Sequence, residues 1–204
     1  MDNMNRVNLC GQVLEAPTFS HSNHGVCFYK FPLRIPRLSG QNDDLTVIIT
    51  KKQWEKTPVV PGEKLHITGQ LRSYNNKSGV GSRLVLSVFA LEIFREDGLP
   101  QNEIWLSGVL CKAPTLRRTP LGREICDVIL AVNRRYGRAD YLPCIAWGAV
   151  AIQVAGMSVG QRFSAQGRIQ SRTYTKSVDG APVQRCAYEV SIMHPLDTEE
   201  MRLL

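Results

Sequence analysis

Apolar and polar residues alternate along most of this chain with a period of two, the pattern of half-buried β-strands. In one run, Phe163, Ala165, Gly167 and Ile169 alternate with arginine, serine and glutamine. The pattern predicts an all-β protein. Similar alternating runs occur at 6–14, 27–35, 45–50, 64–72, 83–93, 103–111, 124–133, 140–146, 162–170 and 185–194.

Two segments interrupt the alternation and have room for a short helix. The first, at 51–57, is rich in lysine and is ended by Pro58. The second, at 147–155, is rich in alanine and valine. Both follow the third strand of a group of five, so each group is predicted to have one helix between its third and fourth strands.

The sequence contains an internal repeat of about 97 residues. Residues 7–18 align with residues 104–115, and both read as strand, glycine, strand and then Ala-Pro-Thr. The period is far longer than that of solenoid repeats, so each copy is predicted to have a core of its own. We expect domain 1 at 1–97, a charged Gly- and Pro-bearing linker at 98–102, domain 2 at 103–196 and a short tail at 197–204.

Five strands with one helix between the third and fourth is the element order of the OB-fold, a Greek-key barrel. A glycine lies inside the first and fourth strands of each copy, at the positions of Gly11, Gly69, Gly108 and Gly167. Such glycines allow a small sheet to bend and close into a barrel. The sequence therefore predicts two tandem five-stranded OB-fold barrels.

Residues 103–194 resemble bacterial single-stranded DNA-binding proteins along nearly their whole length. The resemblance rests on the run from Gly160 to Tyr174, on Tyr-Glu-Val ending at Val190, and on the aromatic and glycine residues from Tyr141 to Gly148. The first copy fits at 8–11, 16–17, 62–69 and 71–74, and less well between. The resemblance implies an OB-fold that binds single-stranded DNA. The long acidic tail of typical members is expected to be missing.

Positive charge is concentrated in the second copy. The chain has 25 Lys+Arg and 18 Asp+Glu, a net charge of +7. Residues 104–185 alone hold twelve basic and four acidic residues, a local charge of +8. Residues 1–100 have twelve and nine, or +3. A sequence-independent binder of single strands needs such a cationic groove together with aromatic rings on which bases stack, so we expect the second copy to bind more tightly.

Parity along the strands selects most of the candidate binding residues, and the others are basic or aromatic residues of a loop at 134–136, of the helical segment at Trp54 and of the hairpin at Lys77. On the fourth strand of the second copy the basic and aromatic positions lie opposite Phe163 and Ile169. The candidates in this copy are Arg134, Arg135, Tyr136, Tyr141, Trp147, Arg162, Arg168, Arg172 and Tyr174. Those in the first copy are Trp54, Lys64, Arg72, Tyr74 and Lys77. The first copy has no aromatic residue where the second has Tyr141 and Trp147.

No catalytic constellation and no cofactor motif is found, so the protein is not expected to be an enzyme. His21, His24 and Cys27 are possible zinc ligands but lack a fourth partner, and a polar hairpin loop is the preferred interpretation. The six cysteines form no Cys-x-x-Cys pair and are expected to be buried and unpaired. With no signal peptide or long apolar stretch, the protein is expected to be cytoplasmic.

The favoured hypothesis is a non-specific single-stranded DNA-binding protein that acts in replication, repair or recombination. The resemblance also implies a homodimer, because members of that family act as sets of four OB domains and each chain supplies two. One alternative is a replication-restart or mobile-element accessory protein that acts through protein contacts. Another is an RNA-binding OB protein, because stacking platforms accept either sugar.

Overall fold

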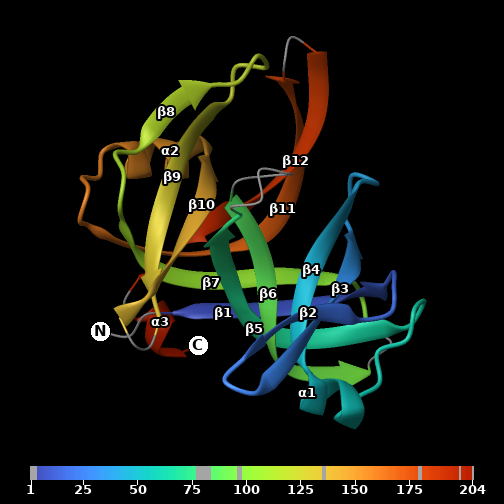
Figure 1. Cartoon of the computed structure of the whole chain (residues 1–204). Coiled ribbons are helices and arrows are strands. Elements are labelled where there is room, and N and C mark those ends of the chain that lie inside the picture. Colours follow the sequence, from blue (N-terminus) through green and yellow to red (C-terminus); the bar gives the residue numbers. More distant parts are fainter. Residues whose placement is uncertain are drawn as a thin grey trace. The chain divides into compact units, whose positions relative to one another are not determined.

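The computed structural model describes residues 4–76, 84–95, 98–134, 137–178, 181–197 and 199–203. They form an all-β protein with short helices, as the alternation predicts (Figure 1). By its contacts the chain divides into two compact units. One comprises residues 6–72 and 86–103, and the other comprises residues 1–5, 73–85 and 104–204. The expected domain boundaries at 97 and 103 stay a prediction.

The first repeat contains six strands and one helix. Its elements are β1 (Asn5–Val13), β2 (Thr18–Asn23), β3 (Val26–Pro36), β4 (Asn42–Thr50), α1 (Lys51–Lys56), β5 (Lys64–Asn75) and β6 (Leu84–Arg95). Five of these strands close a barrel in the order β1-β3-β4-β6-β5-β1, with β4 and β6 parallel. Leu9, Phe31, Ile49 and Ile67 are fully buried in its core. The barrel and the position of its helix confirm the predicted OB-fold order.

The second repeat follows the same plan. Its elements are β7 (Gln101–Leu110), β8 (Thr115–Arg118), β9 (Glu124–Asn133), β10 (Ala139–Trp147), α2 (Gly148–Ala155), β11 (Arg162–Val178), β12 (Ala181–Pro195) and α3 (Glu200–Leu203). The barrel order is β7-β9-β10-β12-β11-β7. Strands β11 and β12 pair from Ala165 and Pro195 out to Val178 and Ala181, so they continue as a long hairpin (Figure 1).

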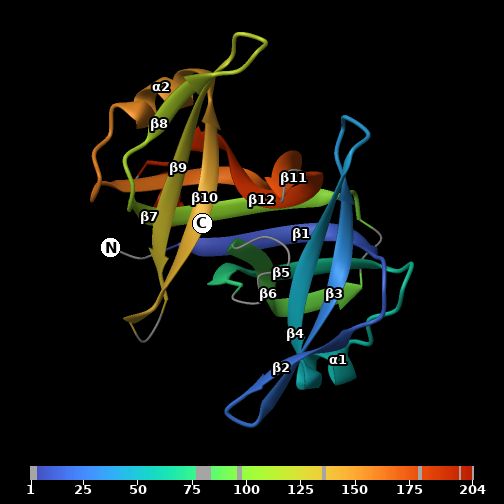
Figure 2. The ribbon, with the colours of Figure 1, turned by 45° about the horizontal axis from the view of Figure 1, so that its top comes forward.

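Each repeat has one strand more than the five predicted. Strand β2 pairs with β3, and β8 pairs with β9, and both lie outside their barrels as edges of a hairpin (Figure 2). The β2–β3 turn contains His24 and Gly25, both with positive φ, so the stretch interpreted as a polar hairpin loop is a two-stranded hairpin. The alternating pattern did not predict these short strands, because their side chains are largely exposed on both faces.

The helix of the first repeat is held by a capping box. The Thr50 hydroxyl accepts a hydrogen bond from the backbone N–H of Gln53, and the Gln53 side chain accepts one from the backbone N–H of Thr50. Gln53 Nε2 also donates to the carbonyl oxygens of Ala90 and Leu91, both at 3.0 Å. The side chain of one residue therefore joins the start of α1 to strand β6.

The glycines inside the first and fourth strands lie where backbones approach too closely for a side chain. A Cβ on Gly11 would lie 2.5 Å from the carbonyl oxygen of Arg34, and one on Gly108 would lie 2.8 Å from that of Ala131. In the fourth strands, Gly69 and Gly167 approach the carbonyl oxygens of Phe89 and Ser191 in the same way. These glycines therefore allow the close contact between strands that barrel closure requires, as predicted.

A buried ion pair spans the turn before the third barrel strand in both repeats. Arg37 Nε donates to Asp43 Oδ2 at 2.7 Å, and Arg134 Nε donates to Asp140 Oδ2 at 2.6 Å. Both aspartates are completely buried. The two pairs are related by the repeat offset of 97. Neither ion pair was predicted from the sequence. Arg134 was predicted to be a binding residue.

The cysteines are unpaired and differ in exposure, with Cys27 only partly buried. Cys10, Cys126 and Cys144 are buried as expected, whereas Cys111 and Cys186 are exposed, so the expectation of burial was wrong for those two. Burial raises the pKa of the Cys144 thiol, and the negative charge of Glu189 adds to this effect. No helix among the residues the structure describes is long and apolar enough to cross a membrane.

Replacing Gly108 with alanine is expected to destabilise the protein by about 1–3 kcal/mol, because the new Cβ forces strands β7 and β9 apart. The matched control is Gly156→Ala in the same unit. Gly156 has φ −79° and its Cβ would lie 3.5 Å from the nearest atom, so stability is expected to be unchanged or raised by up to about 1 kcal/mol. Urea denaturation measures both, and equal stability of the two variants would contradict the close approach.

The raised pKa of Cys144 predicts a loss of stability in alkaline solution. Above about pH 8.5 the unfolded chain releases the thiol proton, whereas the folded chain keeps it. The free energy of unfolding should therefore fall as the pH rises past this value, by up to about 1.4 kcal/mol per pH unit for one thiol. Urea denaturation between pH 7.5 and 10 should show a shallower decline for Cys144→Val than for the parent protein. Parallel pH profiles would refute the contribution of this thiol.

Candidate nucleic-acid interface

The outer face of β10 presents two aromatic side chains. Tyr141 is 53% exposed and Trp147 is 37% exposed, whereas Leu142, Cys144 and Ala146 point into the core. Trp147 Nε1 donates a hydrogen bond to Ser191 Oγ on the neighbouring strand β12 at 3.1 Å. This bond fixes the indole on the outer surface of the barrel, with part of its ring open to solvent.

The basic residues of β11 lie on the same outer surface. Phe163 and Ile169 are buried, while Arg162 is exposed and Arg168 is partly exposed. Arg162 Nη1 donates to Ser107 Oγ on β7 at 3.2 Å. Arg162 and Arg168 share the parity that the sequence assigned to them, so both reach the outside of the barrel.

Arg172 pairs with a buried carboxylate on β12 and lies over the ring of Tyr174. Arg172 Nε donates to Glu189 Oε2 at 3.0 Å, and Gln170 Nε2 donates to Glu189 Oε1 at 3.0 Å. The Arg172 guanidinium lies over the Tyr174 ring, 5.6 Å from its centroid. Although Glu189 is buried, the Arg172 side chain is 53% exposed. The ring and the guanidinium therefore form one cationic and aromatic surface at the base of the hairpin.

These groups belong to a single face that spans three adjacent strands. Strand β12 lies between β10 and β11, and its outward positions Glu189 and Ser191 are two residues apart. Ser191 holds Trp147 from β10, and Glu189 holds Arg172 from β11. We call this surface, made by Tyr141, Trp147, Arg162, Arg168, Arg172 and Tyr174, the β10–β11 face.

Arg134 has a partner inside the protein. Besides its ion pair with the buried Asp140, its Nη2 donates to the carbonyl oxygen of Ser73 at 3.2 Å. Ser73 belongs to the same unit, and its N–H donates to Asp140 Oδ1 at 2.6 Å while its hydroxyl accepts from the Tyr141 N–H at 2.9 Å. Arg134 thus takes part in a network that holds the start of β10, next to Tyr141.

Three of the candidate residues lie outside the described part of the chain. They are Lys77, Arg135 and Tyr136. Their proposed contacts stay predictions.

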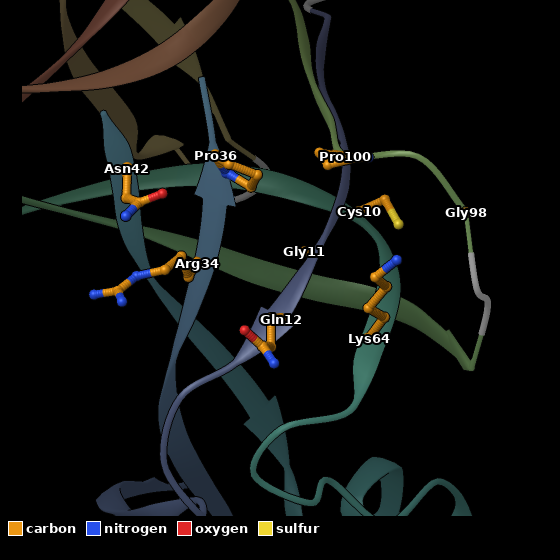
Figure 3. Close-up of a pocket in the computed structure, with 9 residues that line it drawn as sticks. All are labelled: Cys10, Gly11, Gln12, Arg34, Pro36, Asn42, Lys64, Gly98 and Pro100. Atoms are coloured by element: carbon orange, nitrogen blue, oxygen red, sulfur yellow. The ribbon is translucent and has the colours of Figure 1, made fainter. Parts of the chain in front are cut away.

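The described candidates of the first repeat have different surroundings. Trp54 on α1 packs against Tyr29, with ring centroids 4.8 Å apart. Lys64 lines an open pocket of about 260 Å³, where it extends towards Cys10 and the segment Gly98–Pro100 (Figure 3). Tyr74 is 55% exposed near the end of β5.

An aromatic row that was not predicted from the sequence lies on the outside of the first barrel. The rings of Phe28 on β3 and Phe89 on β6 have centroids 6.2 Å apart. His21 on β2 stacks on Phe28 with an interplanar angle of 11°, and the Arg72 guanidinium lies 5.9 Å from the Phe89 centroid. Alternation could have found this row, because Phe28 and Phe89 have the parity opposite to the core residues Phe31 and Val88. We call His21, Phe28, Phe89 and Arg72 the aromatic row.

The arrangement has the properties of a binding surface and lacks those of a metal centre. Among the described residues, no group of three or more His, Cys, Asp and Glu side chains could hold a metal ion. The β10–β11 face instead combines partly exposed rings with guanidinium groups. Such a surface can stack planar, unpaired bases and pair with phosphates.

The second repeat is similar in sequence to known proteins. Residues 101–195 match the model of the single-strand binding protein family. Over 89 residues the chain is 37% identical to single-stranded DNA-binding protein 2 of Listeria innocua, and this match covers 40% of the chain and 55% of that protein. The chain therefore spans about half the length of this relative. Over 80 residues it is 38% identical to single-stranded DNA-binding protein B of Bacillus subtilis, a match that covers 36% of the chain and 71% of that protein.

The fold of the whole chain is similar to that of a solved structure. The crystal structure of wild-type single-stranded DNA binding protein from Thermus aquaticus superposes with a TM-score of 0.77 over 96% of this chain and 93% of that one, at 21% identity. This similarity extends the tandem OB-fold across both repeats. The family match of the second repeat and the 38% identity to the Bacillus protein, of which 71% is covered, show that the chain is a member of the single-strand binding protein family.

Proposed function

We propose that the protein binds single-stranded DNA without sequence preference through the β10–β11 face. The observation that carries the proposal is the placement of Trp147 and Arg172 on either side of β12, each held by a hydrogen bond to that strand. Stacking on Trp147, Tyr141 and Tyr174 accepts any base, because every base has a π-face. The guanidinium groups of Arg162, Arg168 and Arg172 supply the phosphate contacts.

The balance of charge supports a polyanionic ligand. Residues 104–185 carry a local charge of +8, and the four glutamate and aspartate residues among them include Asp127 and Glu124, which pair with Arg117 and Arg118 on the β8–β9 hairpin. Two of these acidic residues thus pair with cations of that hairpin. On the face itself, Arg172 pairs with Glu189, which lies beyond residue 185, and the three arginines of the face stand against this one carboxylate. The face therefore combines positive charge with stacking surface.

We further propose a role for this binding in DNA replication, repair or recombination in the bacterial cytoplasm. Two barrels per chain make a homodimer the smallest symmetric assembly with four barrels. The same proposal includes replication or repair proteins as binding partners. The protein would protect the strand by covering it and would carry out no catalysis.

Titration with oligo-dT of about 30 nucleotides, followed by tryptophan fluorescence, tests the binding. We expect quenching that weakens steeply with salt, because each phosphate contact adds about 0.7 to the slope of log K against log salt for a single strand. Absence of binding would refute the proposal. A parallel titration with oligo-rU separates a DNA preference from a general affinity for single strands.

Single substitutions test whether the strand binds at the β10–β11 face. Tyr141→Ala is expected to weaken binding by about 1–3 kcal/mol, roughly 5- to 150-fold, through the loss of one stacked base. Arg168→Ala should reduce the salt slope by about 0.7. The control is Arg123→Ala, which removes the same charge from the β8–β9 hairpin and should leave the affinity nearly unchanged. Equal effects of Arg123→Ala and Arg168→Ala would show that general charge, and not this face, governs binding.

A further inference from the structure

Tyr141 differs from the other aromatic residues of the β10–β11 face in how its ring is held. Trp147 donates a hydrogen bond to Ser191, and the Arg172 guanidinium lies over the ring of Tyr174. The Tyr141 side chain is 53% exposed, and no hydrogen bond, ring contact or cation contact joins it to another residue in the described part of the chain. The direction of this ring therefore depends on the backbone of β10 from which it projects.

The backbone of Tyr141 is held on both sides of β10. On one side, Tyr141 lies opposite Ala131 in the antiparallel ladder with β9. The N–H of Arg134 donates to the carbonyl oxygen of Arg138 at the turn, so alternate pairs of this ladder are hydrogen-bonded and the Tyr141 N–H points away from β9. That N–H donates instead to Ser73 Oγ at 2.9 Å. A side-chain hydroxyl group thus supplies the acceptor on the second side of the strand.

Ser73 is itself fixed by a buried carboxylate. Its N–H donates to Asp140 Oδ1 at 2.6 Å, and its carbonyl oxygen accepts a hydrogen bond from Arg134 Nη2 at 3.2 Å. Asp140 is completely buried and pairs with Arg134, so its bonds cannot be exchanged for water at little cost. Ser73 lies on β5, a strand of the first repeat, yet it belongs to the same compact unit as β10. All three polar groups of Ser73 are therefore used at the start of β10.

We infer that Ser73 is a positioning residue for Tyr141, whose ring it orients for stacking on a base. This inference rests on the proposed function and adds to it a residue that acts through the backbone of Tyr141 and not by contact with the strand. The hydroxyl group restrains φ and ψ of Tyr141, and the backbone conformation in turn determines which rotamers the ring can adopt. Binding at the face of the second repeat then depends on a residue that the first repeat supplies.

Replacing Ser73 with alanine removes only the hydroxyl group, because the bonds to Asp140 and Arg134 use the backbone of Ser73. We expect the affinity for oligo-dT of about 30 nucleotides to fall about 3- to 10-fold, the equivalent of one hydrogen bond. The slope of log K against log salt should stay the same, since no cation is lost. Ser73→Thr keeps the hydroxyl group and should bind like the parent protein. The matched control is Thr68→Val on the same strand, which removes a hydroxyl group that donates to Glu92 and should leave the affinity unchanged.

A double-mutant cycle with Tyr141→Ala separates positioning from a general structural effect. If Ser73 acts through Tyr141, Ser73→Ala should weaken binding in the parent protein and have no further effect once the ring is absent. Equal losses in the two backgrounds would refute the inference. Parent affinity of the Ser73→Ala variant would refute it as well. Thermal unfolding checks that each variant is folded.

Fluorine NMR of protein labelled with 3-fluorotyrosine observes the ring directly, without a ligand. The signals are assigned by Tyr→Phe variants. In Ser73→Ala, the signal of Tyr141 should shift or broaden while those of Tyr29 and Tyr188 stay unchanged. An unchanged Tyr141 signal would overturn the inference even where the affinity falls, because the ring would then keep its orientation without the hydroxyl group.

The outcomes keep this inference and the proposed function apart. If the parent protein binds oligo-dT and Ser73→Ala binds equally well, only the positioning role is refuted. If the parent protein binds no oligonucleotide, the proposed function fails, and the role of Ser73 in stacking fails with it.

Discussion

Both barrels depend on backbone contacts that a side chain would prevent. Gly11 and Gly108 let the first strand of each barrel pack against its second strand, β3 or β9, and Gly69 and Gly167 do the same for the fourth and last strands. Once these strands close, the pleat determines which residues point outward. The carbonyl that Gly69 accommodates belongs to Phe89, and the one that Gly167 accommodates belongs to Ser191. Closure of the barrel and exposure of the candidate binding surfaces therefore come from the same contacts.

Alternation and glycine placement were sufficient to predict the barrels, because both follow directly from the strand period and from the space a Cβ needs. The parity of Arg162 and Arg168 on β11 was likewise correct. Alternation cannot reveal partners that lie far apart in the sequence. The side chain of Arg134 looked like part of a basic loop, yet it pairs with Asp140, and Glu189 lies beneath Arg172. Short exposed strands such as β2 have no buried side to give a signal.

The two repeats share the ion pairs in their turns but differ in the side chains of their outer surfaces. The ion pairs of Arg37 with Asp43 and of Arg134 with Asp140 occur at equivalent positions, which indicates that this turn needs a compensated carboxylate in either copy. The outer surface has instead been rebuilt, with Phe28 and Phe89 around Thr50 in one barrel and Trp147 beside Ser191 in the other. The interior and the turns restrict substitution by packing and charge. On the outer face, several combinations of side chains can supply flat aromatic area, so this surface is less restricted by packing.

The buried carboxylate of Glu189 has a consequence for the thermodynamics of any ligand on the β10–β11 face. Because Glu189 holds Arg172 and Gln170, and Ser191 holds Trp147, these side chains lose rotamer freedom when the protein folds. A ligand then meets groups that are already oriented, and it need not bear the entropy of ordering them, which is about 0.5–1.5 kcal/mol for each immobilised side chain. Most of the remaining entropic cost of association at this face belongs to the ligand.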